Sequence, residues 1–484
     1  MRNSNSQAVH LKKEILVRLA AAFLGGDYPQ AARLIPYDMR PKGSEVPFRC
    51  CIHKERAILK DRVIAGMGFA IEADDEKTLL SEYAERSLSR KRPEDQPLTV
   101  LGAACRGCVP NRIYVTDLCQ GCVARECQSV CKFGAISIVN GKSAIDGAKC
   151  KNCKMCVNVC PYKAIVRIAV PCEDCCPVGA ITKNPQGLAQ INFAKCIVCG
   201  KCLAACPFGA VHEKSQLIDV LNQLKRGQRV IALLAPSIAG QFPGSPGQLK
   251  TALQISGFSD AYEVALGADI TASNEAREFT ERLDSGQSFM TTSCCAGYQE
   301  LLKKHLPEIV PFVSSTRTPL YYAAEKARRE NPVALIVFIG PCVAKKMEGL
   351  GNPAIDYVLN YEELGALFIA QKIEILSCPE TPFAQESSRQ GKNFGFCGGV
   401  AAAVSAAAGR PERLKPCLID GLNKDTIKQL KKMAAERTCP EGNLIEVMCC
   451  EGGCIGGNAA LNTLKLAKKI ILEYSDRAPE IKGL

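Results

Sequence analysis

The sequence predicts an α+β region rich in cysteine, followed by an α/β domain with mostly parallel sheets. Three observations predict this fold class. Residues 1–100 are mostly helical in pattern, CxxC spacings dominate the next hundred residues, and apolar strands then alternate with helical stretches. We expect an N-terminal region at 1–100, two cluster-binding domains at 101–165 and 166–215, and a C-terminal domain at 225–484.

Composition favours metal ligation over disulfide bonding. The chain has 47% hydrophobic residues, ample for buried cores, and 29 cysteines. We find no secretory leader and no apolar segment of the roughly 20 residues that span a bilayer. We therefore expect a soluble, cytoplasmic protein without a membrane span, in which thiols stay reduced and bind metal.

The formal charge of +12 would ordinarily indicate a nucleic-acid partner, but it counts every cysteine as neutral. A 4Fe-4S core held by four thiolates carries about −2 when oxidised, so five such clusters contribute about −10. Most lysines and arginines are then counter-charge, and we expect no nucleic acid.

The N-terminal region carries no motif that assigns it a role. The stretch "LKKEILVRLAAAFLGG" predicts an amphipathic helix, and "ERSLSRKRPEDQP" has the composition of a linker. Cys50, Cys51 and His53 offer metal-binding atoms, although two adjacent cysteines rarely share one small cluster. A structural role is the favoured interpretation for all three.

Eight cysteines between residues 119 and 160 have the spacing of a two-cluster ferredoxin. In that pattern three close cysteines hold one cubane, and the fourth reaches the neighbouring cluster. The first predicted ligand set is Cys119, Cys122, Cys127 and Cys160. The second predicted set is Cys150, Cys153, Cys156 and Cys131.

A less regular pair of motifs follows in "PCEDCCPVGAI" and "KCIVCGKCLAACPFGAV", whose shared CPxGA endings mark an internal repeat. The third predicted ligand set is Cys196, Cys199, Cys202 and Cys176. The first half of the repeat lacks two ligands, which an upstream CxxC can supply. The fourth predicted set is Cys105, Cys108, Cys172 and Cys206. In the alternative, Cys175 replaces one of the upstream cysteines.

In the C-terminal domain, three apolar strands end by delivering cysteines. They are "SFMTTSCC", "PVALIVFIGPC" and "NLIEVMCCEGGC". Ligands gather at the carboxyl ends of strands in open α/β sheets, so one site can collect all three. The alternative, buried structural cysteines, is less favoured because glycine or proline flanks these strand ends.

These segments resemble the three signature motifs of the FeFe-hydrogenase family. They read TSCCAGY at 292–298, GPCVAKKME at 340–348 and EVMCCEGGCIGG at 446–457. With "LLAPSIAGQF" the resemblance covers residues 225–470, and about three quarters of the chain with the ferredoxin-like part included. It implies reversible interconversion of protons and electrons with H2, with electrons passing through about four accessory 4Fe-4S clusters to or from ferredoxin or a similar low-potential carrier.

The resemblance also implies the cofactor and its ligands. The cofactor is the H-cluster, a 4Fe-4S cubane joined to a diiron subsite with carbon monoxide, cyanide and an azadithiolate bridge. The implied cubane ligands are Cys295, Cys342, Cys450 and Cys454, the last bridging to the diiron half. Lys345 corresponds to a residue that hydrogen-bonds a cyanide, which suits an ammonium in a dry site. The implied pocket residues are Ala235, Pro236, Ser237, Phe394 and Met448.

A proton route is implied as well. Cys294 corresponds to the proton relay beside the bridging amine, a role that thiols can fill. Glu275, Glu278 and Arg282 lie at spacings of three and four, on one face of a helix. With Ser314 they fall on the family's proton-pathway positions. We interpret them as a path from Cys294 through Glu278 and Ser314 to Glu275 and Arg282.

Three departures from the family pattern surround the pocket. Gly340 stands where well-studied members have methionine, Ala296-Gly297-Tyr298 replaces a proline and tryptophan region, and "GGNAA" replaces a GGGQP ending. They suit a divergent, group B-like subgroup. Two other functions remain open: a non-catalytic iron-sulfur assembly or carrier relative, and a hydrogen sensor. The proton path speaks against the first, and the lack of a signalling segment against the second.

Overall fold

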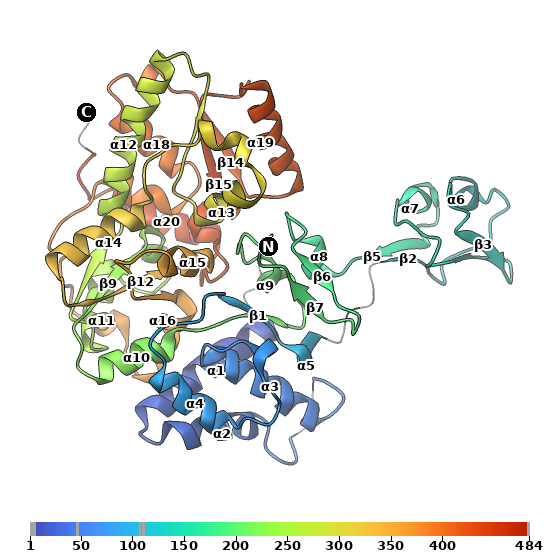
Figure 1. Ribbon diagram of the computed structural model, residues 1–484, viewed down its shortest axis with the longest axis horizontal. Coiled ribbons are helices and arrows are strands. Elements are labelled where there is room, and N and C mark those ends of the chain that lie inside the picture. The colour runs from blue at the N-terminus through green and yellow to red at the C-terminus, as the bar shows by residue number, and fades with distance from the viewer. Residues whose placement is uncertain (1–5, 45–47, 106–107, 109–111, 482–484) are drawn as a thin grey trace.

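The computed structural model describes residues 6–44, 48–105, 108 and 112–481. Figure 1 shows an elongated body from which one small unit projects as an arm. The body holds the N-terminal helices, the inner cluster-binding segment and the C-terminal domain. Among the described residues, no helix is long and apolar enough to cross a bilayer.

The N-terminal region is helical, as predicted. Its helices are α1 (Gln7–Leu24), α2 (Tyr28–Met39), α3 (Ile52–Gly66) and α4 (Leu80–Ser89). The amphipathic face of α1 buries Leu19 in the same hydrophobic core as Val337 and Leu359 of the C-terminal domain. The Lys12 ammonium of α1 also forms an ion pair with Glu362, at 2.6 Å. The N-terminal helices thus share one core with the C-terminal domain.

The prediction that the charged stretch "ERSLSRKRPEDQP" is a linker is wrong for the first part of that stretch. Helix α4 continues to Ser89, inside that charged stretch. Directly after the helix, Arg90 Nε donates to Asp219 Oδ1 at 2.6 Å. Asp219 is itself buried. The charged residues are therefore fixed to the body by a buried ion pair.

The cluster-binding segment leaves and rejoins the body at one place. Strand β1 (Leu98–Val100) pairs antiparallel with β8 (Val211–Glu213), so residues 101–210 form an insertion between two paired strands. Helix α5 (Gly102–Cys105) begins the insertion. Its inner part contains α8 (Pro171–Asp174), β6 (Ile181–Lys183), β7 (Ala189–Ile191) and α9 (Lys201–Ala205).

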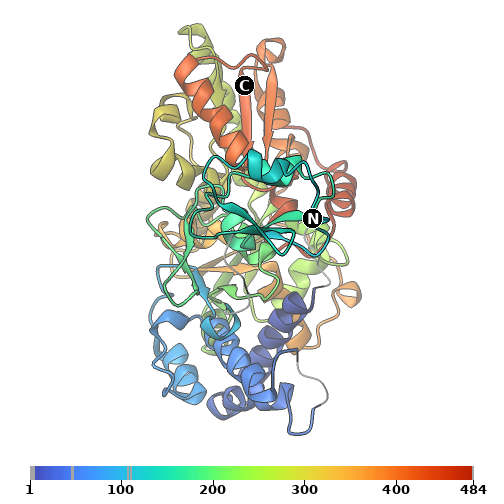
Figure 2. The same ribbon diagram turned by 90° about the vertical axis from the view of Figure 1, so that its right-hand side faces the viewer.

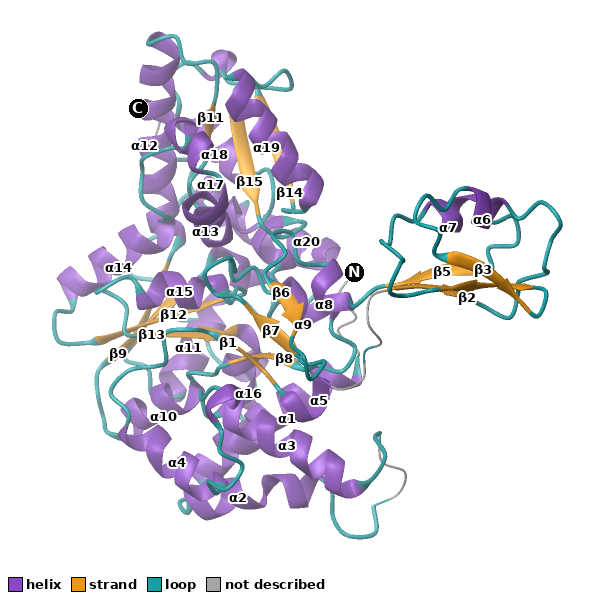
Figure 3. Cartoon of the chain, turned by 45° about the vertical axis from the view of Figure 1, so that its right-hand side comes forward, coloured by secondary structure: helices purple, strands orange, loops and turns teal. Residues whose placement is uncertain are grey.

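The arm comprises residues 112–168. Strand β2 (Arg112–Val115) pairs antiparallel with β5 (Ile165–Ile168), and the hairpin of β3 (Ile136–Val139) and β4 (Lys142–Ile145) lies beyond them. Two short helices, α6 (Glu126–Ser129) and α7 (Met155–Val159), cover one face of these strands (Figure 3). In Figure 2 the arm projects toward the viewer, in front of the body.

The C-terminal domain contains two parallel sheets, as predicted. The first has the order β10-β9-β12-β13 and the second β11-β15-β14. Their bounds are β9 (Val230–Leu234), β10 (Asp260–Glu263), β11 (Met290–Thr291), β12 (Leu335–Gly340), β13 (Tyr357–Asn360), β14 (Pro416–Asp420) and β15 (Leu444–Met448). Strands β9 and β15 are buried along their whole length, which is typical of parallel strands covered on both faces.

Ten helices of at least seven residues surround these sheets in the described part of the chain. They are α10 (Leu217–Lys225), α11 (Pro246–Ile255), α12 (Ala265–Asp284), α13 (Ala296–His305), α14 (Pro319–Glu330), α15 (Ala344–Leu350), α16 (Tyr361–Ala370), α18 (Gly399–Ala407), α19 (Lys424–Glu436) and α20 (Leu464–Ser475). Helices α12 and α14 meet at Gly267, where a Cβ would lie 2.1 Å from the Pro319 carbonyl oxygen. Only glycine permits this approach.

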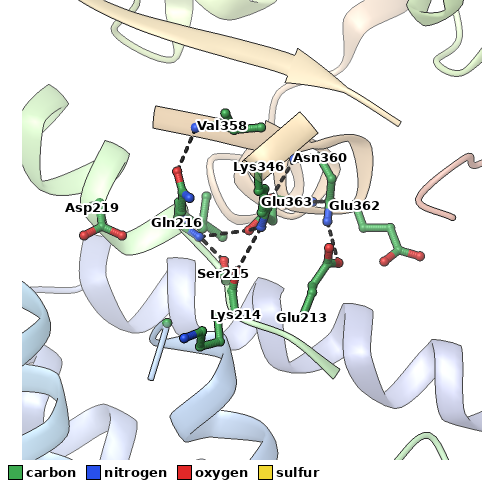
Figure 4. A network of polar contacts seen from close by, with 12 residues as sticks. Glu213, Lys214, Ser215, Gln216, Asp219, Lys346, Val358, Asn360, Glu362 and Glu363 are labelled. Carbon is green, nitrogen blue, oxygen red and sulfur yellow. Dashed lines mark hydrogen bonds and ion pairs between the residues drawn. The ribbon is translucent and has the colours of Figure 1, made fainter. Parts of the chain in front are cut away.

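A buried polar network fixes helix α15 (Figure 4). The Lys346 ammonium donates to Glu363 Oε1 at 2.9 Å and to the Lys214 carbonyl at 3.0 Å. The same Glu363 oxygen accepts from the Gln216 amide at 3.0 Å. Because an unpaired buried charge is costly, this pairing holds α15 against the segment that follows β8.

Candidate active site

Strand ends from both parallel sheets meet at one cavity of about 80 Å³. Strand β9 leads into Ala235, β12 into Cys342, β11 into Cys294 and Cys295, and β15 into Cys450. This agrees with the general tendency of carboxyl strand ends to form binding sites. Every residue assigned to the H-cluster pocket by resemblance lines this cavity, namely Ala235, Pro236, Ser237, Cys294, Cys295, Cys342, Lys345, Phe394, Met448, Cys450 and Cys454.

Four of the lining thiols form a mutually interacting group. Burial raises the pKa of Cys342, and Cys450, Cys295 and Cys454 raise it further. Burial likewise raises the pKa of Cys454 to about 12. Free thiolates are therefore strongly disfavoured here, and a positively charged metal core would relieve their repulsion.

The number and position of these thiols suit a 4Fe-4S cluster. In such a cubane each of four thiolates binds a different iron. Cys295, Cys342, Cys450 and Cys454 all line the same mostly apolar cavity, and each is half-buried. Four half-buried thiols around an apolar cavity fit this group.

Lys345 brings one positive charge to the cavity. It lies in the first turn of α15, and its Nζ is 2.5 Å from Glu348 Oε2. Burial disfavours the ammonium, but Glu348 and the thiols of Cys454 and Cys342 outweigh this, so the pKa of Lys345 is raised. The side chain thus remains a cation suited to an anionic ligand.

Apolar side chains and one hydroxyl form the remaining wall. Phe394 and Met448 are both buried at the cavity. The Ser237 hydroxyl is hydrogen-bonded to the Tyr361 hydroxyl at 2.6 Å, in a fully buried pair. These contacts fix the loop after β9 and keep water from the cavity wall.

One departure from the family pattern has a structural explanation. A Cβ on Gly340 would lie 2.5 Å from the ring of Phe338. Both residues belong to β12 and are two positions apart, so they share one face of the strand. Phe338 lines the cavity, and its ring occupies the volume that a larger residue 340 would need.

The proton-path residues are arranged in a different order from the one we expected. Glu275 is fully buried, and its Oε1 accepts from the Ser293 amide at 2.9 Å and the Ser293 hydroxyl at 3.2 Å. Ser293 directly precedes Cys294. Burial, followed by Glu275, raises the pKa of the Cys294 thiol. Glu275, rather than Glu278, is therefore the carboxyl next to Cys294.

Glu278 occupies the outer position. It accepts from the Ser314 hydroxyl at 2.8 Å, and Arg282 donates to it at 2.5 Å. Burial opposes its charge, but bonds from Ser315 and Ser314 and the Arg282 charge outweigh this, so the pKa of Glu278 is lowered. Arg282 is partly exposed. The expected order is thus wrong: Glu275 is inside, with Glu278, Ser314 and Arg282 outside.

The two carboxyls therefore differ in protonation. Burial raises the pKa of Glu275 to about 7, despite bonds from Ser293 that lower it. Its Oε2 is buried and has no hydrogen-bond partner among the described residues. Because its pKa lies near neutral, Glu275 can both accept and release a proton at physiological pH.

The arm brings together cysteines from both predicted ligand sets. Cys127, Cys131, Cys150, Cys156 and Cys160 share one small core. Cys156 interacts electrostatically with Cys150, Cys153 and Cys131, its predicted partners. In the other set, Cys119 and Cys127 both contact Ser143. Cys122 lies in the loop between them.

The inner segment gathers two further groups of thiols. The electrostatic neighbours of Cys202 are Cys199, Cys175, Cys196 and Cys176. Those of Cys172 and Cys108 are Cys206 and Cys105. The Cys175 thiol instead donates to the Cys172 carbonyl at 3.4 Å. Its thiol neighbours are Cys199, Cys176 and Cys172, which belong to both groups.

Two neighbours of the predicted ligands did not emerge from the sequence. Ser293 links Glu275 to the cavity loop, and no motif marks it. Cys449 is buried at the cavity, beside Cys450. The doubled cysteine was the available signal, but sequence alone does not say which thiol contacts what. Cys50, by contrast, is exposed, and its sulfur is 3.9 Å from that of Cys51.

Comparison with known proteins gives a consistent result. The family "Iron only hydrogenase large subunit, C-terminal domain" matches residues 228–458, "LdpA Fe-S cluster-binding domain" residues 167–217 and "4Fe-4S binding domain" residues 144–166. The periplasmic [Fe] hydrogenase large subunit of Nitratidesulfovibrio vulgaris is 30% identical over 370 residues, covering 65% of this chain and 85% of that protein. The expected cytoplasmic location stays a prediction beside this periplasmic relative.

Two further matches are more distant. Iron hydrogenase 1 of Clostridium pasteurianum is 27% identical over 316 residues, 54% of this chain and 55% of that protein, so the chain spans about half of its length. A solved FeFe-hydrogenase from Chlamydomonas reinhardtii is 18% identical, covers 56% of this chain and 91% of its own, and gives a TM-score of 0.44, too low to add to the assignment. On the family match and the Nitratidesulfovibrio relative, the chain belongs to the iron-only, or FeFe, hydrogenase family.

Proposed function

We propose that this protein interconverts protons and electrons with H2 at an H-cluster held by Cys295, Cys342, Cys450 and Cys454. One observation carries the proposal: one cavity is lined by these four thiols, by the Lys345 ammonium and by Cys294. Family membership supports it. When bound, the H-cluster supplies the redox chemistry that makes and splits dihydrogen.

The protein's own side chains bind and insulate that group. The Lys345 ammonium would donate to an anionic ligand of the bound group, an interaction that is strong where water is excluded. Ala235, Pro236, Phe394 and Met448 form the dry wall around it. Ser237, held by Tyr361, keeps the loop after β9 in place.

The proton path follows the contacts of α12. Cys294 holds the proton nearest the diiron subsite and exchanges it with Glu275, whose raised pKa suits a relay. Glu278 and Ser314 form the outer station, and Arg282 keeps Glu278 charged. A proton thus passes from the partly exposed end of the helix to its buried middle.

Electrons would take a separate route through four accessory 4Fe-4S clusters. The cysteines of the arm would hold two of them and those of the inner segment the other two, the fourth on Cys105, Cys108, Cys172 and Cys206. Exposed lysines such as Lys149 and Lys151 surround the arm clusters. They favour an acidic, low-potential partner such as a ferredoxin, because complementary charge speeds encounter.

Infrared spectroscopy of anaerobically matured protein tests the proposal. We expect carbonyl and cyanide bands, which are lost in Cys454→Ala. The matched control is Cys378→Ala, because Cys378 is a buried thiol that donates to the Glu374 carbonyl, at 3.5 Å, and should keep the bands. Iron-sulfur absorption without these bands would contradict the proposal and favour the carrier alternative.

Turnover separates an enzyme from a sensor. With a reduced low-potential donor, we expect sustained H2 production from the matured protein. Bands without such turnover would favour the sensing alternative.

A further inference from the structure

Cys449 lies at the junction between two sets of predicted cluster ligands, although it belongs to neither. It is 4% exposed and follows β15 directly. Its side chain packs in one hydrophobic cluster with Cys199 and Cys295, and hydrogen bonds with the thiols of Cys199 and Cys450 raise the pKa of Cys449. Cys199 belongs to the third accessory set, and Cys450 to the H-cluster cubane. One side chain therefore contacts a ligand sulfur on each side of the last electron-transfer step.

The backbone around Cys449 strengthens this junction. The Cys449 amide donates to the sulfur of Cys295, another cubane ligand, at 3.4 Å. Its carbonyl accepts from the Leu422 amide at 3.1 Å. The Leu422 carbonyl in turn accepts from the Lys201 ammonium, two residues after Cys199. Strand β15 and the accessory cluster loop are thus tied together beside the Cys449 thiol.

The sequence makes room for this sulfur. A Cβ on Gly297 would lie 2.9 Å from Cys449 Sγ, closer than side-chain atoms normally approach. Gly297 belongs to the Ala296-Gly297-Tyr298 departure from the family pattern. Helix α13 can therefore pass over Cys449 only because residue 297 has no side chain. The departure at 297 and the extra thiol at 449 form one packing unit.

Chemistry decides which partner donates. With clusters bound, Cys199 and Cys450 are thiolates and can only accept, whereas Cys449 binds no iron and keeps its S–H. A hydrogen bond to a ligand sulfur favours the reduced cluster and raises its reduction potential.

We propose that Cys449 is a positioning residue for electron transfer, whose single S–H donor serves the accessory cluster of Cys199 and the catalytic cubane of Cys450. When both clusters are bound, an electron would pass between them while the S–H bond of Cys449 stays intact. The Cys449 hydrogen bond would favour the ligand sulfur that carries more negative charge. This inference rests on the cluster ligation proposed above, and not on H2 turnover.

A redox titration of the full-length, cluster-loaded protein, followed by electron paramagnetic resonance without H2, tests it. The signal that disappears in Cys199→Ser identifies the accessory cluster. In Cys449→Ala we expect that cluster to be harder to reduce by about tenfold in the one-electron equilibrium, which corresponds to about 59 mV. Cys449→Ser keeps a donor and should stay near the wild-type potential, and Cys378→Ala should not shift it.

Two results would overturn the assignment. One is an unchanged potential in Cys449→Ala with full cluster content, and the other is an equal shift in Cys378→Ala. If Cys449→Ala loses clusters, infrared difference spectra of the wild type decide instead. The S–H stretching band must move when the accessory cluster is reduced, and a band that does not respond refutes the donor role. Absence of all cluster signals would refute the ligation itself.

Discussion

The accessory-cluster side and the α12 side of the cavity are built from different kinds of residue. On the accessory-cluster side, Cys449 and Gly297 are packed in direct contact, and the neighbouring loop is equally tight: a Cβ on Gly200 would lie 2.8 Å from Asn458. On the α12 side, carboxyls and hydroxyls lead from buried Glu275 toward the partly exposed Arg282. The accessory-cluster side therefore consists of sulfur, glycine and backbone atoms. The α12 side consists of a row of titratable groups.

This difference suits the particle that each side transfers, an electron on the accessory-cluster side and a proton on the α12 side. An electron crosses packed atoms without any group changing its bonding, so tight contact and fixed ligands suffice. A proton moves only between groups whose pKa values and hydrogen bonds allow it. Isotope exchange between H2 and D2O needs the proton side alone, whereas turnover with an external donor needs both. The pair of assays therefore separates the two sides.

The largest effect is expected from removing the last accessory cluster. Cys199→Ser should reduce donor-driven H2 production to background, because Cys199 is the accessory-cluster ligand that packs beside Cys449. Isotope exchange should continue, because it requires no electron from outside. Cys378→Ala is the matched control, since this buried thiol donates to a backbone carbonyl away from the predicted ligand sets, and it should preserve both activities. Loss of exchange in Cys199→Ser would mean that the two sides are not separate.

The next largest effect is expected at Cys294. Cys294→Ala should slow both donor-driven turnover and isotope exchange by about 10²–10⁴-fold, the usual contribution of a positioned acid or base. Cluster absorption should stay intact. Cys397→Ala serves as control, because this half-buried thiol packs near the same core. Normal exchange in Cys294→Ala would remove the relay assignment.

A pH dependence should follow from Glu275. Its pKa of about 7 means that it is neutral and able to donate below that pH, and ionised above it. H2 production should therefore fall as pH rises through about 7. In Glu275→Gln that inflection should vanish, and turnover should fall by about 10²-fold. An unchanged pH profile in the variant would contradict this role.

Stability provides a second readout at Glu275. Its folded-state pKa lies above the ordinary glutamate value of 4.5, so the folded protein binds more protons than the unfolded chain between pH 4.5 and about 7. Stability should thus decrease with rising pH across that window. Glu275→Gln should remove this part of the decrease, as thermal unfolding at several pH values would show.

The smallest effect is expected at Ser314. Its hydroxyl helps to lower the pKa of Glu278, so Ser314→Ala should raise that pKa and slow isotope exchange by about tenfold or less, as loss of one hydrogen bond to a charge implies. Thr280→Ala is the control, because the Thr280 hydroxyl donates to the Ala276 carbonyl of its own helix. A loss of isotope exchange as large as that in Cys294→Ala would contradict the outer position of Ser314 in the proton path.

The sequence predicted what covalent spacing determines and missed what packing determines. Strand ends identified the cysteines that line the cavity, and the alternation of strands and helices predicted the parallel sheets around it. CxxC spacings identified the cysteines that gather in the arm and the inner segment. Helical periodicity placed Glu275 and Glu278 on one face, but depth along that face depends on which loop covers it, so their order was wrong. The Phe338 ring likewise fills the space beside Gly340, a contact between two positions that sequence spacing does not reveal.

The paired strands at the base of the arm have one more consequence. Because β2 and β5 lie side by side, the chain leaves the body and returns to it at one place. A segment attached at that place can differ in length or type while the body keeps its own fold. The arm is thus a replaceable module, and exchanging it offers a way to supply the same catalytic domain from a different electron donor.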